Sequence, residues 1–236
     1  MDSYIARITD SELTANGVRV RHPASMRAWL RAYAAATSTD ANYEAILAAA
    51  TPGEADKPAS ETVRGYREAL SRLFVVDPVP AWIPSFSPLR RLNKAPKHHL
   101  VDPALAARLV GVGREGLLRG QGTSMTPAGS TWFGALFESL VTQSVRTYAE
   151  GAAVGHLRTK GGQQEIDLIV ETDNLRVLAI EVKVSESVTP RDTLHLNWLE
   201  SKLGDRLVDK VVINTGPYAY RTKDGTAIVP LSLLSP

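Results

Sequence analysis

The sequence contains no cysteine, which excludes disulfide frameworks and thiolate metal sites. It also lacks any run near the ~18 apolar residues of a membrane-spanning helix. The opening letters M-D-S-Y-I-A-R-I include an early acid and no apolar signal-peptide core. Lysine plus arginine number 27 against 25 for aspartate plus glutamate, so no strong net charge marks the chain as a nucleic-acid binder. These absences predict a cytoplasmic protein without a membrane partner.

A nucleotide-hydrolysis motif is absent as well. The phosphate-binding pattern G-x-x-x-x-G-K-[S/T] does not occur, and the glycines between positions 111 and 122 lack the Lys-Ser/Thr ending. We therefore expect no ATP site in these residues. The same glycines predict a flexible linker over residues 111–130.

The first half of the sequence shows helical patterns. Residues 1–24 are polar and predict an arm or linker. Apolar residues then recur at helical spacing in three segments, 25–36, 42–50 and 60–73. An extended segment at 74–76 and a short helix at 102–112 complete this part. Three short helices followed by an extended segment predict a winged-helix-like helical domain over residues 25–110.

The second half predicts a mixed α/β domain over residues 131–236. Its expected elements, in order, are a helix at 131–149, strands at 153–158, 164–171 and 175–184, a helix at 191–203, and strands at 207–215 and 226–231. The fold class predicted for the whole chain is therefore α/β, with a helical domain first and a sheet domain second.

Two of the predicted strands carry charges inside apolar runs. Successive side chains of a strand point to opposite faces, so Glu181 and Lys183 share one face of the third strand. If the second and third strands form a hairpin, Asp167 lies beside Glu181. Adjacent carboxylates repel each other, and a hard cation such as Mg²⁺ or Mn²⁺ relieves that repulsion. The nearby lysine could then stabilise charge on a phosphate or orient a water. The alternative is a solvated sheet face with its charges turned outward.

The pattern Asp167, thirteen residues, then Glu181-Val182-Lys183 resembles the PD-(D/E)XK nuclease superfamily. That resemblance implies a restriction-endonuclease-like αβββαβ domain with Asp167, Glu181 and Lys183 as catalytic residues. In the Holliday-junction-resolvase branch a preceding helix adds a glutamate. The stretch G-A-L-F-E-S-L-V resembles that helix and places Glu138 there, as a third metal ligand beside Asp167 and Glu181. The proline that normally precedes the aspartate is replaced by Ile166.

Nearly the whole chain also resembles the C-terminal region, called DUF4143, of a family of prokaryotic P-loop (AAA-type) ATPases. The segment A-P-K-H-H-L-V-D-P-A-L beginning at Ala95 carries part of this resemblance. It implies a partner ATPase domain, which these residues do not contain. A fragment, a split gene and a degraded paralogue all remain open as explanations.

Basic residues in two places are candidates for nucleic-acid binding. Arg64 and Arg67 lie on the third predicted helix, and a basic connector contributes Arg90, Arg91, Lys94 and Lys97. Solvated surface charge is the competing interpretation.

Two functional hypotheses follow. The first is Mg²⁺-dependent hydrolysis of DNA phosphodiesters, with the winged-helix-like domain binding DNA. The second is a non-catalytic DNA- or protein-binding scaffold or regulator that partners a P-loop ATPase domain or paralogue. A homodimer is expected if both strands of a duplex are cut.

Overall fold

The computed structural model describes residues 2–8, 23–51, 60–84, 95–119 and 131–235. The chain divides into two compact units, which alternate along the sequence. We call the first the helical unit; it comprises Met1–Pro78 and Lys97–Ser139. We call the second the sheet unit; it comprises Val79–Pro96 and Leu140–Pro236. This division differs from the predicted one, which placed a single boundary in the glycine-rich residues 111–130.

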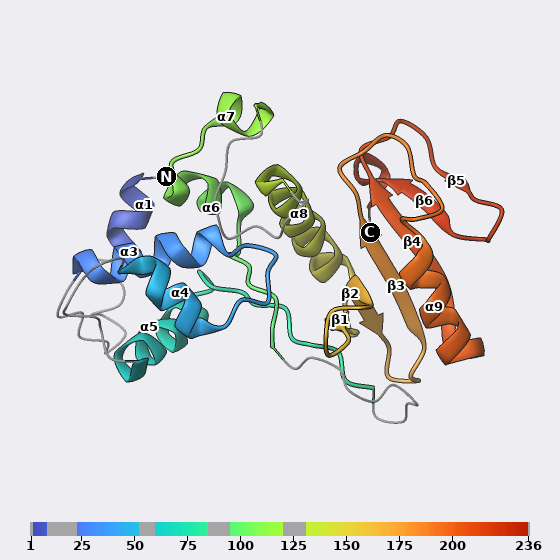
Figure 1. Cartoon of the computed structure of the whole chain (residues 1–236), viewed down its shortest axis with the longest axis horizontal. Coiled ribbons are helices and arrows are strands. Elements are labelled where there is room, and N and C mark those ends of the chain that lie inside the picture. The colour runs from blue at the N-terminus through green and yellow to red at the C-terminus, as the bar shows by residue number, and fades with distance from the viewer. Residues whose placement is uncertain (1, 9–22, 52–59, 85–94, 120–130, 236) are drawn as a thin grey trace. The chain divides into compact units, whose positions relative to one another are not determined.

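The helical unit is built from the helices shown in blue to green in Figure 1 and from the first half of the olive helix α8. They are α1 (Asp2–Arg7), α3 (Pro23–Ala35), α4 (Tyr43–Ala50), α5 (Ser60–Arg72), α6 (Pro103–Val110), α7 (Arg114–Leu118) and the first half of α8 (Trp132–Tyr148). Side-chain caps fix two starts: Asn42 accepts the Ala45 N–H at 2.7 Å, and Asp102 accepts the Ala104 N–H at 2.7 Å. The N-terminal helical region is thus confirmed.

Two short helices lie where the sequence analysis expected irregular chain. Helix α1 occupies part of the predicted arm, and α7 occupies part of the predicted glycine-rich linker. Ile8, directly after α1, is fully buried in the core of the helical unit. This burial ties the beginning of the chain to the unit, although its polar composition resembles that of a linker.

The extended segment predicted at 74–76 is reduced to an isolated bridge between Val76 and Leu100. Phe74 has a φ of 55°, which lies outside the strand region, so the extended conformation cannot include this residue. Within the described part of the helical unit no strand forms, so the winged-helix detail is not confirmed. None of the described helices has the length and hydropathy needed to cross a membrane.

The sheet unit contains a mixed sheet of six strands among the described residues, in the order β1-β2-β3-β4-β6-β5. The strands are β1 (Ala153–Arg158), β2 (Glu165–Glu171), β3 (Val177–Val182), β4 (Leu207–Asn214), β5 (Tyr220–Arg221) and β6 (Ala227–Pro230). The first three are antiparallel, whereas β4 is parallel to both β3 and β6. Five of the six match predicted strands; β5 is too short to leave a sequence pattern.

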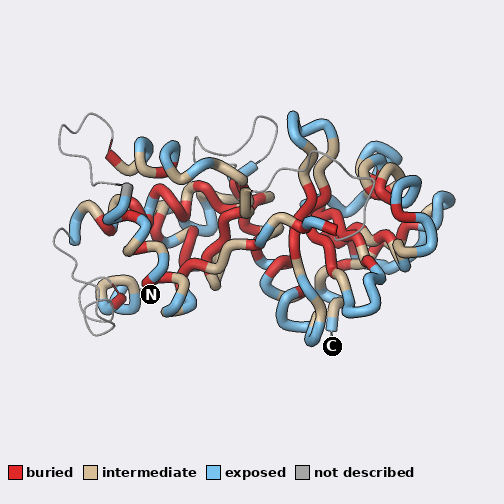
Figure 2. The backbone as a smooth tube through the Cα atoms, turned by 90° about the horizontal axis from the view of Figure 1, so that it is seen from below, coloured by how far each residue is buried: buried red, intermediate tan, exposed pale blue. Residues whose placement is uncertain are grey.

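Helix α9 (Leu194–Leu203) covers one face of this sheet and runs along β3 and β4 (Figure 1). Its buried leucines, including Leu196 and Leu199, pack in one apolar cluster with Ile169 and Ala179 of the sheet. The opposite face is buried too, since Leu168 and Ile180 are 1% and 3% exposed. The central strands are therefore buried along most of their length, while the turns are exposed (Figure 2). A residue on either face of β2 or β3 is removed from water.

Residues 79–84 pair with β1 and belong to the sheet unit. The Trp82 N–H donates to the His156 carbonyl at 2.7 Å, and the indole Nε1 donates to Glu171 Oε2 at 2.7 Å. The contact requires glycine in β1, because a Cβ on Gly155 would lie 3.0 Å from the Pro80 carbonyl oxygen. We call residues 79–84 the strap. It pairs with the outer edge of the sheet at His156, whose backbone N–H and carbonyl groups would otherwise be unpaired.

Candidate metal and catalytic site

The structure places Asp167 and Glu181 side by side on paired strands. Strands β2 and β3 pair from Leu168 with Ile180 to Glu171 with Val177. One further step in this register sets Asp167 opposite Glu181. Both lie on the face covered by α9, because side chains two apart in a strand share a face and Ile169 and Ala179 belong to the α9 cluster. The sequence pattern predicted this juxtaposition.

Both carboxylates are buried. Asp167 is 9% exposed and Glu181 is 3% exposed. A solvated strand edge, the alternative left open by the sequence, would have left them in water. Burying two like charges together is unfavourable unless cations or donors compensate them. The burial therefore excludes a solvated strand edge. It also means that nearby positive charges or hydrogen-bond donors must compensate the two carboxylates.

Part of that compensation comes from Lys183, whose Nζ lies 3.2 Å from Glu181 Oε2. Partial burial alone would lower the pKa of Lys183. The negative charges of Glu181 and Asp167 outweigh that effect and raise the pKa above its ordinary value. Asp192, in the loop before α9, contributes in the same direction. The lysine therefore carries a positive charge at neutral pH.

The second compensating donor is a backbone amide. Asp167 Oδ2 accepts the N–H of Val182 at 2.9 Å, so its side chain takes the place of a strand partner where β3 ends. The Lys183 N–H continues the β3–β4 ladder by donating to the Ile213 carbonyl at 2.9 Å. These bonds fix the backbone between Glu181 and Lys183. Rigid strands hold site geometry better than loops do.

The donor set fits a hard divalent cation. Mg²⁺ is commonly held by one or two carboxylates, with waters and substrate phosphates completing an octahedron. Asp167 and Glu181 supply two such groups. No cluster of three or more His, Cys, Asp or Glu side chains suited to a metal occurs among the residues that the structure describes. Two carboxylates on paired strands suit a site in which waters and substrate complete the coordination.

Glu138 lies in the helical unit, on the first half of α8. Its Oε1 accepts Lys97 Nζ at 2.8 Å, and the side chain of Lys97 is only 3% exposed. Sequence reasoning missed this buried ion pair and had assigned the two residues to different tasks. The role of Glu138 as a third metal ligand stays a prediction.

The other basic candidates have separate surroundings. Arg64 pairs with Glu61 at 2.8 Å on the exposed face of α5, and the guanidinium of Arg67 lies 4.0 Å from the centre of the Tyr43 ring. Their role in nucleic-acid binding stays a prediction. Arg90, Arg91 and Lys94 lie outside the described residues.

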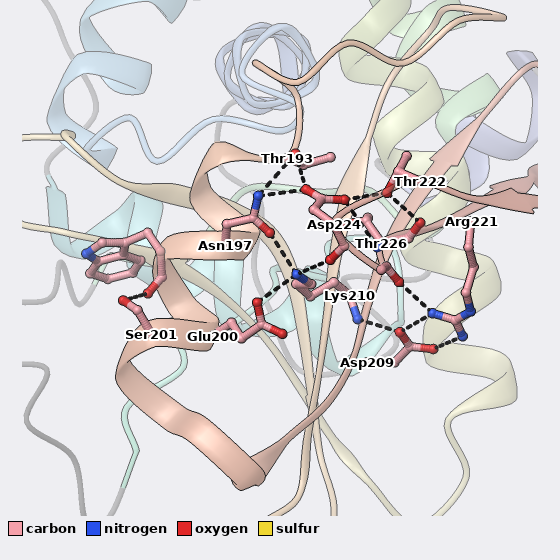
Figure 3. Close-up of polar contacts among 12 residues, drawn as sticks. Thr193, Asn197, Glu200, Ser201, Asp209, Lys210, Arg221, Thr222, Asp224 and Thr226 are labelled. Atoms are coloured by element: carbon pink, nitrogen blue, oxygen red, sulfur yellow. Dashed lines mark hydrogen bonds and ion pairs between the residues drawn. The ribbon is translucent and has the colours of Figure 1, made fainter.

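A polar network beside the site connects α9, β4 and the turn between β5 and β6 (Figure 3). Lys210 is 4% exposed, and its Nζ donates to Asn197 and Glu200, both at 2.7 Å, and to the Asp224 carbonyl at 3.0 Å. The Asp224 carboxylate in turn accepts from Thr193, Asn197 and Thr222. The sequence offered one signal for this network: Lys210 stands directly before the apolar run Val211–Ile213 of β4.

Acidification is expected to loosen this network. Hydrogen bonds from Thr222 and Asn197 hold the pKa of Asp224 well below its ordinary value. A carboxyl with a lowered folded-state pKa stabilises fully above its unfolded pKa, about 3.9, and loses that contribution as the pH falls toward the folded value. Thermal unfolding should be measured from pH 6 to pH 2. At pH 6 the melting temperature of the wild type should be higher than that of Asp224→Asn, and this difference should shrink below about pH 4. A difference in melting temperature that does not change with pH would contradict a stabilising role of the ionised Asp224 carboxylate.

Comparisons with known proteins agree with part of the sequence resemblance. Residues 133–234 match the family model described as domain of unknown function (DUF4143), which confirms that part of the resemblance. Residues 1–116 match a different model, domain of unknown function (DUF8612). No curated protein matches the chain. Among solved structures, a refined half-complex from a tetradecameric assembly of Thermococcus gammatolerans McrB AAA+ hexamers with bound McrC shares 13% identity, covering 87% of this chain and 70% of that chain. Its TM-score of 0.29 is too low to establish a shared fold.

Proposed function

We propose that the sheet unit is a nuclease-like module that hydrolyses DNA phosphodiesters with the help of a divalent cation. The observation that carries this proposal is the buried pair of Asp167 and Glu181 with Lys183 alongside. Buried titratable groups that perturb one another are typical of functional sites. The resemblance of the motif to PD-(D/E)XK nucleases supports the same chemistry.

Each residue has a distinct role in this proposal. Asp167 and Glu181 offer carboxylate oxygens to Mg²⁺ or Mn²⁺, which when bound lowers the pKa of an attached water and polarises the phosphate. Lys183 places a positive charge where negative charge develops on the phosphate oxygens. The backbone bonds at Val182 and Lys183 hold these groups in place before substrate arrives.

Partners are part of the proposal. The DUF4143 resemblance implies that the module works with a P-loop ATPase domain supplied by another chain or chain segment. The helical unit would hold DNA or that partner through Arg64 and Arg67 on α5. Arg90, Arg91 and Lys94 stay predicted contacts from the sequence. Lys97 is a weaker candidate, because its side chain is buried against Glu138. A homodimer would allow both strands of a duplex to be cut.

Metal titration of the full chain tests the site. Calorimetry with MnCl₂ and MgCl₂ should detect binding to the wild-type protein. In Asp167→Asn, which keeps the shape of the side chain but removes its charge, binding should weaken at least about tenfold. Asp173→Asn is the matched control, because Asp173 is an exposed aspartate in the β2–β3 turn of the same sheet. Equal metal binding in Asp167→Asn and wild type would overturn the assignment.

A non-catalytic role is the second candidate, and one observation favours it. Asp167 and Glu181 already bond to groups of the protein, the Val182 N–H and the Lys183 ammonium. In a non-catalytic protein, Asp167 and Glu181 would serve to fix the end of β3, and the sheet unit would be a scaffold for the ATPase partner. Wild-type protein that binds no divalent cation but binds a P-loop ATPase paralogue in a pull-down would support the scaffold.

A further inference from the structure

The hairpin formed by β5 and β6 exposes two aromatic rings. Tyr218 is 77% exposed and Tyr220 is 46% exposed. Neither ring is needed for the core of the sheet unit, whose apolar cluster includes Ile228 of β6 but neither tyrosine. Exposed apolar side chains that gather in one place commonly mark a binding surface, and these two rings stand two residues apart in the chain.

Strand pairing puts this hairpin in line with the candidate site. Glu181 pairs with Val212, Val212 pairs with Ile228, and Ile228 pairs with Tyr220. Directly paired residues point to the same face of a sheet, so Tyr220 lies on the face that bears Glu181. Three strand spacings of about 4.8 Å separate the two residues by roughly 14 Å.

A pocket lies beside the turn that joins β5 to β6. It has a volume of about 370 Å³ and is lined by the loop before α9, with Thr189 and Pro190, and by the β5–β6 turn, with Thr222 and Lys223. Lys223 is exposed at the tip of that turn. The pocket also has Asp224 in its lining, so it combines apolar walls, hydroxyl groups, one ammonium and one carboxylate that already accepts hydrogen bonds from Thr193 and Thr222. Such a lining suits a sugar and a base inside the pocket, with a phosphate at Lys223 on its rim.

We propose that the hairpin Tyr218–Thr226 and this pocket form a binding surface for single-stranded nucleic acid leading to Asp167 and Glu181. This inference rests on the proposed function and names its substrate class. Bases stack on exposed tyrosine rings regardless of sequence, and Lys223 meets the backbone phosphate. A separation of roughly 14 Å corresponds to about four nucleotides at 3.4 Å per nucleotide, or fewer in a more extended strand.

The charge pattern favours a single strand over a duplex. Duplex binding relies mainly on several lysines and arginines that neutralise phosphates. On this hairpin Arg221 is engaged by Asp209 at 2.9 and 2.7 Å, so its charge is compensated within the protein. Stacking on Tyr218 and Tyr220 requires unpaired bases and little net charge.

Fluorescence anisotropy with a labelled 20-mer of dT tests the proposal on the full chain. EDTA is present throughout, so that binding is measured without any contribution from a metal at Asp167. Tyr220→Ala and Tyr218→Ala should each weaken binding by about 5- to 100-fold. Tyr220→Phe should keep most of the affinity because the ring can still stack. The matched control is Tyr148→Ala on α8, which removes another tyrosine that is 41% exposed.

The outcomes separate this surface from the metal site. Loss of dT binding in Tyr218→Ala and Tyr220→Ala, with Tyr148→Ala unchanged, supports the surface whatever the metal titration shows. Equal affinity in all four variants, no binding by the wild type, or tighter binding of a 20-base-pair duplex than of the single strand overturns it. Tyr218 lies outside the strands, so Tyr218→Ala keeps the test valid even if Tyr220→Ala disturbs strand pairing.

Discussion

Lys183→Met is expected to reduce DNA cleavage by at least about 100-fold while divalent cations bind more tightly. The two effects have opposite signs because the ammonium stabilises the transition state but competes with the cation for Glu181, from which it is 3.2 Å away. A cleavage assay on a labelled oligonucleotide and calorimetry with MnCl₂ measure the two effects separately. Methionine keeps the length of the side chain and removes only its charge.

Lys160→Met is the control for this prediction, since Lys160 is exposed in the turn between β1 and β2. It should leave both cleavage and metal binding near the wild-type values. Unchanged cleavage in Lys183→Met would contradict the catalytic role. Weaker metal binding together with a lower melting temperature would instead assign Lys183 to the stability of the site.

Lys210→Met is expected to destabilise the sheet unit by about 2–3 kcal/mol. Removing one partner of a buried ion pair typically costs about 3–5 kcal/mol. The side chain of Glu200 is 54% exposed and can regain water, which places the expected loss below that range. For a unit of this size, such a loss corresponds to a melting temperature lower by roughly 10 °C.

Thermal and urea unfolding measure the loss, and hydrogen exchange locates it. Exchange should accelerate first at the β5–β6 turn, because Lys210 holds that turn through the Asp224 carbonyl at 3.0 Å. Lys202→Met removes an exposed lysine from the same α9 helix and should change stability by less than about 0.5 kcal/mol. If Lys210→Met unfolds like Lys202→Met, the network in Figure 3 does not stabilise the fold.

The regular elements of the chain could be predicted from its sequence because their signals are local. Helical spacing identifies α3, α4 and α5, and runs such as E-I-D-L-I-V-E identify β2. Strand β5 and helix α1 were not predicted, because short elements show little periodicity in the sequence. The strap at residues 79–84 escaped for another reason: its pairing with β1 depends on residues far away in sequence, above all Gly155 and Glu171.

In the candidate site, too, local features could be predicted from the sequence, whereas features that depend on distant residues could not. The i, i+2 spacing of Glu181 and Lys183 and the hairpin pairing with Asp167 follow from strand geometry alone. Their burial does not, since it depends on α9 packing over the sheet. The Lys97–Glu138 pair, joined at 2.8 Å, also links residues too far apart for any local pattern to reveal.

The alternation of the two units along the chain limits how this protein can be cut and recombined. The chain passes between the units at three places, near residues 78, 96 and 139, and the last crossing lies inside α8. A gene exchange at the border of the two family matches, between residues 116 and 133, would separate Trp82 from Glu171. Homologous donors would then have to supply a compatible strap. Both halves are therefore expected to be inherited together, as one evolutionary unit.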